Sequence, residues 1–181
     1  MLEAAGIPVE TMGAELDERA VEARLPDSPP DVLAMLLARE KARTVAAKCP
    51  GCAVLGADQI LAVNGRRFSK ARDRASARDQ LMALAGRAHA LYSVAAVVQN
   101  DKVLFEHVGV ARLTMRALSA AFLENYLDLA GSAVTSSVGG YQVESLGIQL
   151  FDRIEGDHFT ILGLPLIALL DFFRREGWLA A

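Results

Sequence analysis

Long apolar runs and a secretory start are both missing from this sequence of 181 residues. The longest apolar stretches, 53–63 and 163–170, fall well short of the roughly 20 residues that cross a bilayer, and Asp58 interrupts the first. The opening Met1-Leu2-Glu3-Ala4-Ala5-Gly6 turns polar at once, whereas a signal peptide needs a basic start and an apolar core. We therefore expect a cytoplasmic protein that has no membrane partner.

An excess of basic residues is also missing. Nineteen Lys and Arg against 22 Asp and Glu give a formal net charge of -3, with the basic residues scattered along the chain. A duplex nucleic acid requires a basic patch or stripe, because its phosphates supply most of the binding energy. We expect no nucleic-acid partner, and an anionic ligand would need a local positive pocket.

Cysteine is scarce: Cys49 and Cys52 are the whole complement and form a C-x-x-C. Redox pairs of this kind follow a strand and open a helix, whose dipole lowers the pKa of the thiol. This pair instead follows a predicted helix and precedes a predicted strand. A zinc site would need a second pair of ligands, which the sequence does not space accordingly. We interpret the pair as two reduced thiols in a turn.

Hydrophobic residues, by contrast, make up 52% of the chain, which is typical of one folded domain over residues 1–181. Caps, prolines, glycines and β-rich runs predict helices over 30–48, 74–84, 119–131 and 165–173, and strands over 53–63, 90–99, 103–115 and 148–154. The stretch 131–147 is rich in Gly and Ser and is predicted to be a loop region with functional potential. Alternating strands and helices favour an α/β fold with a cleft.

Polar residues interrupt two of these apolar patterns. The stripe that begins at Leu33 and Leu37 continues at helical spacing onto Glu40 and Lys41, which we expect to face something polar inside the fold. Asp58 lies in a strand that is apolar on both sides, where an unpaired carboxylate would cost several kcal/mol. Asp58 therefore needs a partner, a metal ion or access to a cleft.

Several short motifs, in this order and spacing, resemble the Maf family of nucleotide pyrophosphatases over nearly the whole chain. They are Ala38-Arg39-Glu40-Lys41-Ala42, Gly56-Ala57-Asp58-Gln59, Gly86-Arg87-Ala88-His89, Leu146-Gly147-Ile148-Gln149-Leu150-Phe151-Asp152-Arg153-Ile154-Glu155-Gly156-Asp157 and Leu162-Gly163-Leu164-Pro165-Leu166. The resemblance implies a mixed β-sheet with flanking helices in two lobes around a nucleotide cleft, as in inosine triphosphate pyrophosphatases. It implies a hydrolase that cuts nucleoside triphosphates to the monophosphate and pyrophosphate with a divalent metal, Mg or Mn, and it implies a homodimer.

The resemblance also implies roles for single residues. Asp58 would be the catalytic proton acceptor, with a buried, salt-bridged aspartate as the alternative. Glu18 and Glu40 would lie near the metal, and Glu18 could equally be a solvated loop charge. Lys41 and Lys70 would neutralise phosphate charge. Ser69 and Ala71 beside Lys70 depart from the family pattern, which usually has Gly and Pro there.

Gln59 and Glu144 resemble the branch of the family that acts on 7-methylguanosine triphosphate, since the thymidine and uridine triphosphate branch carries Thr and Gln there. A carboxylate can accept hydrogen bonds from the N1–H and the exocyclic amine of guanine. A loop hydrogen bond without a ligand is the other interpretation. Thymidine, uridine or inosine triphosphate as substrate, or a non-catalytic nucleotide-binding regulator linked to cell division, stay open as alternatives.

Family members begin with a strand and a Ser- and Arg-rich loop that would bind the triphosphate. The sequence here opens after that point, with residues 1–5 predicted as the end of a helix and Gly6 just past it. Two interpretations stay open: a start codon placed too far downstream, or a truncated copy that lacks this first strand and phosphate loop.

Overall fold

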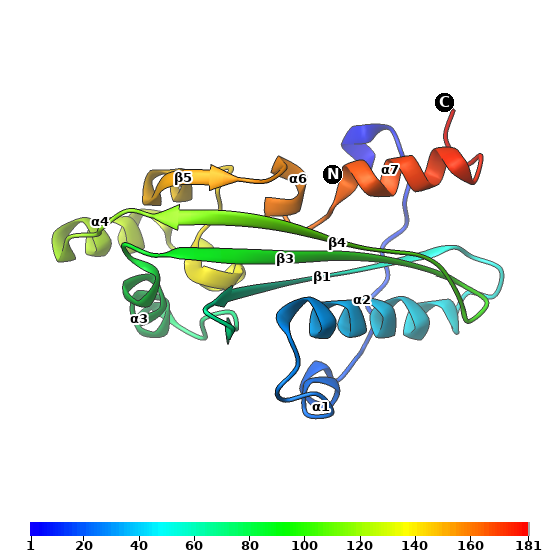
Figure 1. The fold of residues 1–181 in the computed structure, drawn as a ribbon, viewed down its shortest axis with the longest axis horizontal. Coiled ribbons are helices and arrows are strands. Elements are labelled where there is room, and N and C mark those ends of the chain that lie inside the picture. Colours follow the sequence, from blue (N-terminus) through cyan, green and yellow to red (C-terminus); the bar gives the residue numbers. More distant parts are fainter. Residues whose placement is uncertain (181) are drawn as a thin grey trace. The chain divides into compact units, whose positions relative to one another are not determined.

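Local signals in the sequence set most element boundaries in the computed structural model, which describes residues 1–180. Pro30 opens a long helix, Asp73 and Ser119 cap two others through their side chains, and Asn100 and Asp101 turn a hairpin in the left-handed backbone region. Figure 1 shows the resulting ribbon. The α-helices are α1 (Glu18–Glu22), α2 (Pro30–Ala46), α3 (Arg74–Leu84), α4 (Ala120–Ala130), α5 (Ala133–Ser136), α6 (His158–Ile161) and α7 (Leu166–Arg175). The 3-10 helices are η1 (Glu3–Ala5), η2 (Val138–Gly140) and η3 (Leu146–Leu150).

The strands form one five-stranded antiparallel sheet, in the order β2-β1-β3-β4-β5. Its strands are β1 (Val54–Val63), β2 (Arg66–Phe68), β3 (Ala88–Gln99), β4 (Lys102–Met115) and β5 (Phe151–Glu155). The prediction of an α/β fold is confirmed. The chain divides into two compact units, and β1, β3 and β4 contribute residues to both.

The first unit comprises Met1–Gln59, Ser93–Gly109 and the chain from Gly163 onward. Here α2 and α7 cover opposite faces of the sheet (Figure 1). Neighbouring residues of a strand point to opposite sides of the sheet, so β4 contacts both helices. Glu106 of β4 forms an ion pair with Arg39 of α2, whereas the adjacent Phe105 stacks on Phe172 of α7 at 4.8 Å between ring centroids.

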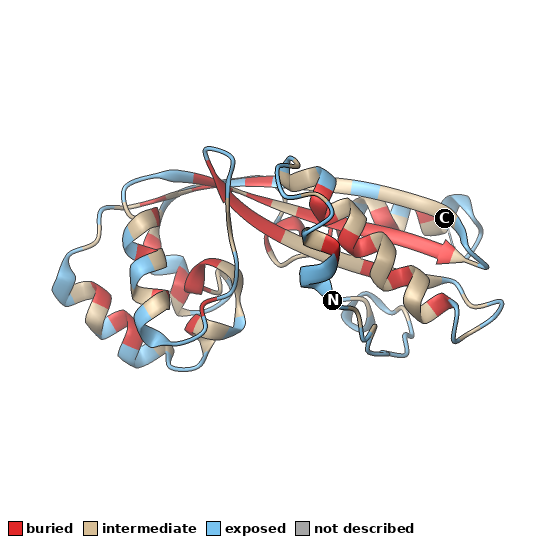
Figure 2. Ribbon diagram, turned by 90° about the horizontal axis from the view of Figure 1, so that it is seen from below, coloured by how far each residue is buried: buried red, intermediate tan, exposed pale blue. Residues whose placement is uncertain are grey.

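The buried stripe of α2 differs from the predicted one. It includes the small residues Ala34, Ala38, Ala42 and Ala46, rather than passing from the leucines onto Glu40. Figure 2 colours the ribbon by burial and shows buried positions recurring along the helices and strands. Alanine is an equally good helix former on a buried or an exposed face, so a hydrophobicity pattern weights it weakly. These alanines allow β1 to approach α2 at Gly56 so closely that a Cβ atom there would lie 2.1 Å from the carbonyl oxygen of Ala38.

The second unit comprises Ile60–Tyr92 and Val110–Leu162. Its core holds large aliphatic side chains from α3, α4 and the strands, together with Tyr126 and Tyr141. Two predictions need correction here. The stretch 131–147 contains α5 and η2 and contributes buried residues, with Gly139 and Gly140 in the left-handed region. The strand expected at 148–154 begins only at Phe151, because η3 occupies the preceding five residues.

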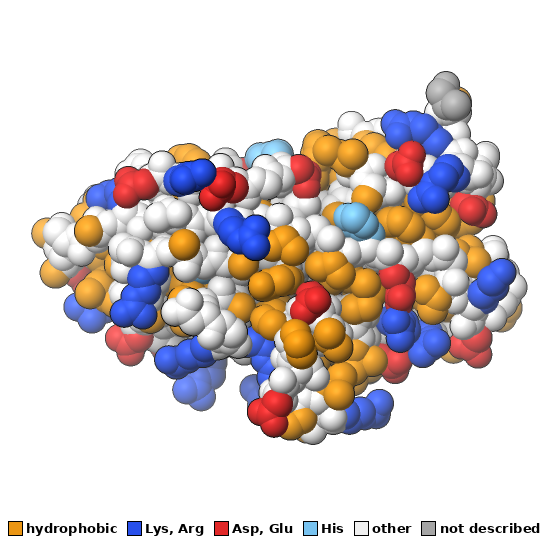
Figure 3. Space-filling model, in the orientation of Figure 1, with side chains coloured by type: hydrophobic (Ala, Val, Ile, Leu, Met, Phe, Trp, Pro, Cys, Tyr) orange, Lys and Arg blue, Asp and Glu red, His pale blue; other side chains and the backbone are white. Residues whose placement is uncertain are grey.

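The interpretation of the cysteines as reduced thiols is wrong, since Cys49 and Cys52 are joined in a disulfide. Position relative to a helix affects the pKa of a thiol, but a four-residue turn also brings two cysteine side chains together. No helix within residues 1–180 is both long and apolar enough to cross a membrane. On the face drawn in Figure 3, acidic and basic side chains are interspersed.

Candidate active site

Asp58 lies on the face of β1 that α2 covers. Gly56, two residues earlier on the same face, sets the close approach of strand and helix, so Asp58 is opposite the next turn of α2. The side chain of Asp58 is 10% exposed, and its Oδ1 accepts a hydrogen bond of 2.7 Å from Nζ of Lys41. The buried carboxylate therefore has the partner that the sequence required.

Lys41 joins a second carboxylate to this pair. Its Nζ lies 2.9 Å from Oε1 of Glu18, the first residue of α1, a short helix that the side chain of Asp17 caps. Burial by itself lowers the pKa of Lys41, but the hydrogen bonds and charges of Asp58 and Glu18 outweigh burial, so the pKa of Lys41 is raised. Lys41 stays protonated between its two carboxylates.

The pKa of Asp58 is also raised above its ordinary value. Burial is the largest cause; Lys41 opposes it, and the negative charges of Glu18 and Glu22 add to it. Glu22 lies one helical turn after Glu18 on α1, and the sequence reasoning missed it. Acids spaced by four residues in a short helix would have been the available signal. A carboxylate with a raised pKa is a stronger base than an ordinary one.

A pocket of about 410 Å³ adjoins this cluster within the first unit. Its lining combines the segment before α1, one side of α2 and the start of β1: Met12, Ala14, Glu15, Leu16, Glu18, Lys41, Val45, Leu55, Gly56 and Ala57. The ionisable lining residues are two glutamates and one lysine, which leaves an excess of one negative charge. The pocket therefore has an apolar surface next to the charged side chains of Glu15, Glu18 and Lys41.

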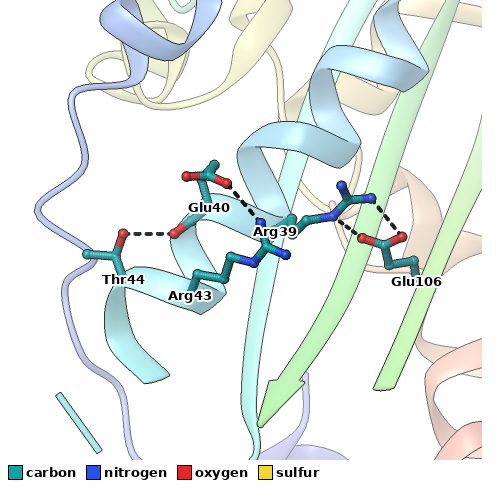
Figure 4. Close-up of polar contacts among 5 residues, drawn as sticks. All are labelled: Arg39, Glu40, Arg43, Thr44 and Glu106. Atoms are coloured by element: carbon teal, nitrogen blue, oxygen red, sulfur yellow. Dashed lines mark hydrogen bonds and ion pairs between the residues drawn. The ribbon is translucent and has the colours of Figure 1, made fainter. Parts of the chain in front are cut away.

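Glu40 does not belong to the contacts around Asp58. Its carboxylate accepts a contact of 3.5 Å from Arg43 of the same helix, and its backbone carbonyl accepts a hydrogen bond from the Thr44 hydroxyl. Figure 4 shows Glu40 leaving α2 on the side opposite Arg39, which reaches Glu106. Because adjacent helical residues differ by about 100° in direction, Glu40 and Lys41 do not share one face.

Gln59 follows Asp58 but points to the opposite face of the sheet. Its Nε2 donates a hydrogen bond of 2.8 Å to Oγ of Ser93 on β3, and Ser93 is fully buried. Gly163, in a left-handed backbone conformation, comes close to the Gln59 amide group. The sequence reasoning missed Ser93, since a single serine in an apolar strand carries no motif.

Lys70 and Glu144 both belong to the second unit. Lys70 follows β2, Glu144 lies between η2 and η3, and both are exposed. Their predicted roles as phosphate and base contacts stay predictions.

Mg or Mn would need oxygen ligands, and magnesium usually takes one or two protein carboxylates beside waters and substrate phosphates. Glu18 can supply such a ligand because its side chain is about half exposed (49%), whereas the ammonium group of Lys41 occupies the point between Glu18 and Asp58. Within residues 1–180 no three His, Cys, Asp or Glu side chains are gathered into a ready-made metal site. Glu18 therefore fits a cation whose other ligands come from water and substrate.

Comparison with known proteins points to one family. A family model described as "Maf-like protein" matches residues 1–176. A protein named nucleoside triphosphate pyrophosphatase from Rhodopseudomonas palustris (strain BisB18) is 53% identical over 180 residues, covering 99% of this chain and 89% of the relative. A protein of the same name from Bradyrhizobium diazoefficiens is also 53% identical with the same coverage. A protein from Mesorhizobium japonicum named 7-methyl-GTP pyrophosphatase is 49% identical, covering 98% of this chain and 90% of the relative.

Proposed function

This chain belongs to the Maf family of nucleoside triphosphate pyrophosphatases, and we propose that within it the chain hydrolyses 7-methylguanosine triphosphate to the monophosphate and pyrophosphate. The chain is a hydrolase of the phosphoanhydride bonds of nucleoside triphosphates. The observation that carries the proposal is the convergence of Asp58, Lys41 and Glu18 beside the pocket.

Asp58 is the proton acceptor in this proposal. A water molecule attacks the α-phosphorus, its proton passes to the Asp58 carboxylate, and pyrophosphate leaves with the electron pair of the broken phosphoanhydride bond. The raised pKa of Asp58 supports this role, because a base is most effective when its pKa approaches the working pH.

Lys41 binds phosphate and holds Asp58 in place. An ammonium group has three N–H donors, and Asp58 and Glu18 engage two of them. The third donor is directed to an oxygen of the triphosphate, where positive charge stabilises the transition state of phosphoryl transfer. Lys70 is proposed as a second phosphate contact.

The charge of the pocket supports a need for a divalent cation. A triphosphate would enter a pocket whose own lining carries an excess of one negative charge. Mg or Mn bound by Glu18 would offset this charge and polarise the phosphate oxygens, with Asp58 left as the proton acceptor. Glu40, with its carboxylate turned to Arg43, is not part of this proposed ligand set.

The proposed base preference rests on Gln59 and Glu144 and on the relative named 7-methyl-GTP pyrophosphatase. The Glu144 carboxylate would accept hydrogen bonds from the N1–H and exocyclic amine of the guanine, which a glutamine could match only in part. Glu144→Gln should therefore lower kcat/KM for 7-methylguanosine triphosphate by about tenfold and leave thymidine triphosphate unaffected.

Pyrophosphate release tests the reaction. With magnesium present, release from 7-methylguanosine, thymidine, uridine and inosine triphosphates would be measured for the native chain, Asp58→Asn and Asp101→Asn. We expect release to be fastest from the methylated nucleotide and to fall about 100-fold or more in Asp58→Asn. The Asp101→Asn variant makes the same change at an exposed turn position that tolerates asparagine, so it should match the native rate.

Two results would contradict the proposed reaction, and a third would contradict only the proposed substrate. Full activity of Asp58→Asn would remove Asp58 from the mechanism. Nucleotide binding without release from any of the four substrates would favour a non-catalytic regulator instead. Faster release from thymidine, uridine or inosine triphosphate would keep the reaction and replace the substrate.

A further inference from the structure

The disulfide between Cys49 and Cys52 closes the turn that links α2 to β1. Both cysteines are partly exposed, so a reagent in solution can reach the sulfur atoms. The turn follows the C-terminal end of α2, where the unpaired carbonyl groups disfavour a thiolate. Opening the bond would therefore leave two protonated thiols rather than a stabilised thiolate.

The turn keeps its place by contacts that do not involve sulfur. The backbone N–H of Gly51 donates to Oδ1 of Asn100 at 2.8 Å, and Nε2 of Gln99 donates to the carbonyl oxygen of Gly51 at 2.8 Å. Behind the turn, Ala42 and Ala46 pack on Val98. These contacts tie the turn to the β3–β4 hairpin, so the fold should survive when the disulfide opens.

Lys48 connects the disulfide to the wall of the pocket. Lys48 immediately precedes Cys49, and its Nζ lies 2.5 Å from Oε2 of Glu15, a residue that lines the pocket. Glu15 itself adopts a left-handed backbone conformation, with φ of 50°, which is unfavourable for glutamate unless contacts hold it. The hydrogen bond from Lys48 is the largest cause that lowers the pKa of Glu15.

The backbone that carries Lys48 depends on the same turn. The backbone N–H of Lys48 donates to Val45 and that of Cys49 donates to Ala46, at 2.9 and 3.2 Å. Three-residue hydrogen bonds of this kind at a helix end fray easily. Cys49 is the last residue of this turn, and its disulfide to Cys52 fixes the chain immediately after Lys48. The disulfide therefore limits fraying at Lys48, the residue that binds Glu15.

We propose that Cys49 and Cys52 form a thiol–disulfide exchange site for dithiol reductants, and that its oxidised state holds the pocket wall at residues 12–18 in place through Lys48 and Glu15. A thiolate of the dithiol attacks the sulfur of one cysteine, the Cys49–Cys52 bond breaks, and the other cysteine leaves as a thiol once it takes up a proton, so that a mixed disulfide remains on the attacked cysteine. The second thiol of the reductant then attacks the reductant's sulfur in that mixed disulfide and releases the attacked cysteine as the second protein thiol. Two electrons and two protons pass from the dithiol to the protein, which gains two thiols while the reductant becomes a disulfide.

Two measurements without substrate test this proposal. Alkylation by N-ethylmaleimide, read by intact mass, would count free thiols before and after incubation with dithiothreitol, and after reoxidation by its oxidised form. Amide hydrogen exchange would then be compared between the two states. We expect no alkylation before reduction, alkylation of both cysteines after it, and exchange over 12–18 that is faster by a factor of about two to five.

Lys48→Met and Cys49→Ser/Cys52→Ser are the informative variants. Both should show the faster exchange over 12–18 without any reductant, whereas exchange over 151–155 in the second unit should stay unchanged. Cysteines that react fully before reduction and do not close again would overturn the proposal. Reduction that leaves exchange over 12–18 unaltered would overturn it as well. Because neither readout involves nucleotide hydrolysis, the result is independent of the proposed function.

Discussion

Gly56→Ala should separate α2 from β1 and disturb the site around Asp58. A Cβ atom at Gly56 would lie 2.1 Å from the carbonyl oxygen of Ala38 and 2.8 Å from the backbone nitrogen of Ala42. Carbon–oxygen contacts settle at about 3.3 Å or more. Both obstacles are helix backbone, which cannot rotate away, so α2 must shift from the strand by about 1 Å.

The free energy of unfolding should fall accordingly. Overpacking usually costs about 1 to 3 kcal/mol, and a clash with backbone belongs at the upper end of that range. For a chain of this length, about 3 kcal/mol corresponds to a Tm lower by roughly 6 to 12 °C. The same shift would lengthen the 2.7 Å contact between Lys41 and Asp58, so pyrophosphate release should drop as well.

Urea unfolding followed by circular dichroism would measure the effect, with Gly13→Ala as the matched control. A Cβ atom at Gly13 meets nothing within 4 Å, so this variant should stay within about 0.5 kcal/mol of the native chain. If Gly56→Ala were as stable and as active as the native chain, the argument that this glycine places Asp58 against α2 would be refuted.

Three further predictions concern charge and hydrogen bonding. Lys41→Met removes the cation that lowers the pKa of Asp58, so the acid limb of the pH profile for pyrophosphate release should move to higher pH, whereas Lys41→Arg should retain the limb. Burial lowers the pKa of His89 to about 4, below its ordinary value of 6.5, so the folded state holds the neutral ring. The stability from this shift is present above about pH 6.5 and is lost as the pH falls to about 4; urea unfolding over that range should show a loss of up to about 3 kcal/mol, absent in His89→Leu. Tyr126→Phe removes a buried hydrogen bond of 3.0 Å to the carbonyl oxygen of Gly140 and should lower the free energy of unfolding by about 1 to 2 kcal/mol in the same assay.

The sequence predicted helices and strands best where a specific residue marks a boundary. Pro30 begins α2 and Leu84 ends α3 as expected, and Asn100 with Asp101 forms the hairpin turn. These signals are local, because they depend on backbone angles and caps within a few residues. The prediction at Ile148 failed because a 3-10 turn and a strand can both place apolar residues at close spacing.

The candidate site was predicted in part. Asp58 and Lys41 were singled out as polar residues in apolar patterns, and the structure joins them. Glu40 was placed on the same stripe because leucines were counted and alanines were not. Ser93 became visible only with the tertiary structure, since its partner Gln59 is distant in sequence, whereas the four-residue spacing of Glu18 and Glu22 was a signal that the prediction did not use.

Asp58 and Gln59 illustrate how one motif can serve two faces of a sheet. Alternation along β1 directs Asp58 to Lys41 on the α2 side, and Gln59 to Ser93 on the other side. An influence of Gln59 on base preference would therefore be indirect, through the strand and its contact with Ser93, and separable from the catalytic role proposed for Asp58. Gln59→Thr is expected to change the ratio of kcat/KM between 7-methylguanosine and thymidine triphosphates by about tenfold while the acid limb of the pH profile stays in place.

The comparison needs only the two substrates and a series of buffers. A change in specificity without movement of the limb follows if the two side chains act from opposite faces, because Gln59 hydrogen-bonds to Ser93 whereas burial and Lys41 are the main influences on the pKa of Asp58. Movement of the limb in Gln59→Thr would mean that this residue acts on the Asp58 carboxylate, and the division of labour between the two faces of β1 would have to be abandoned.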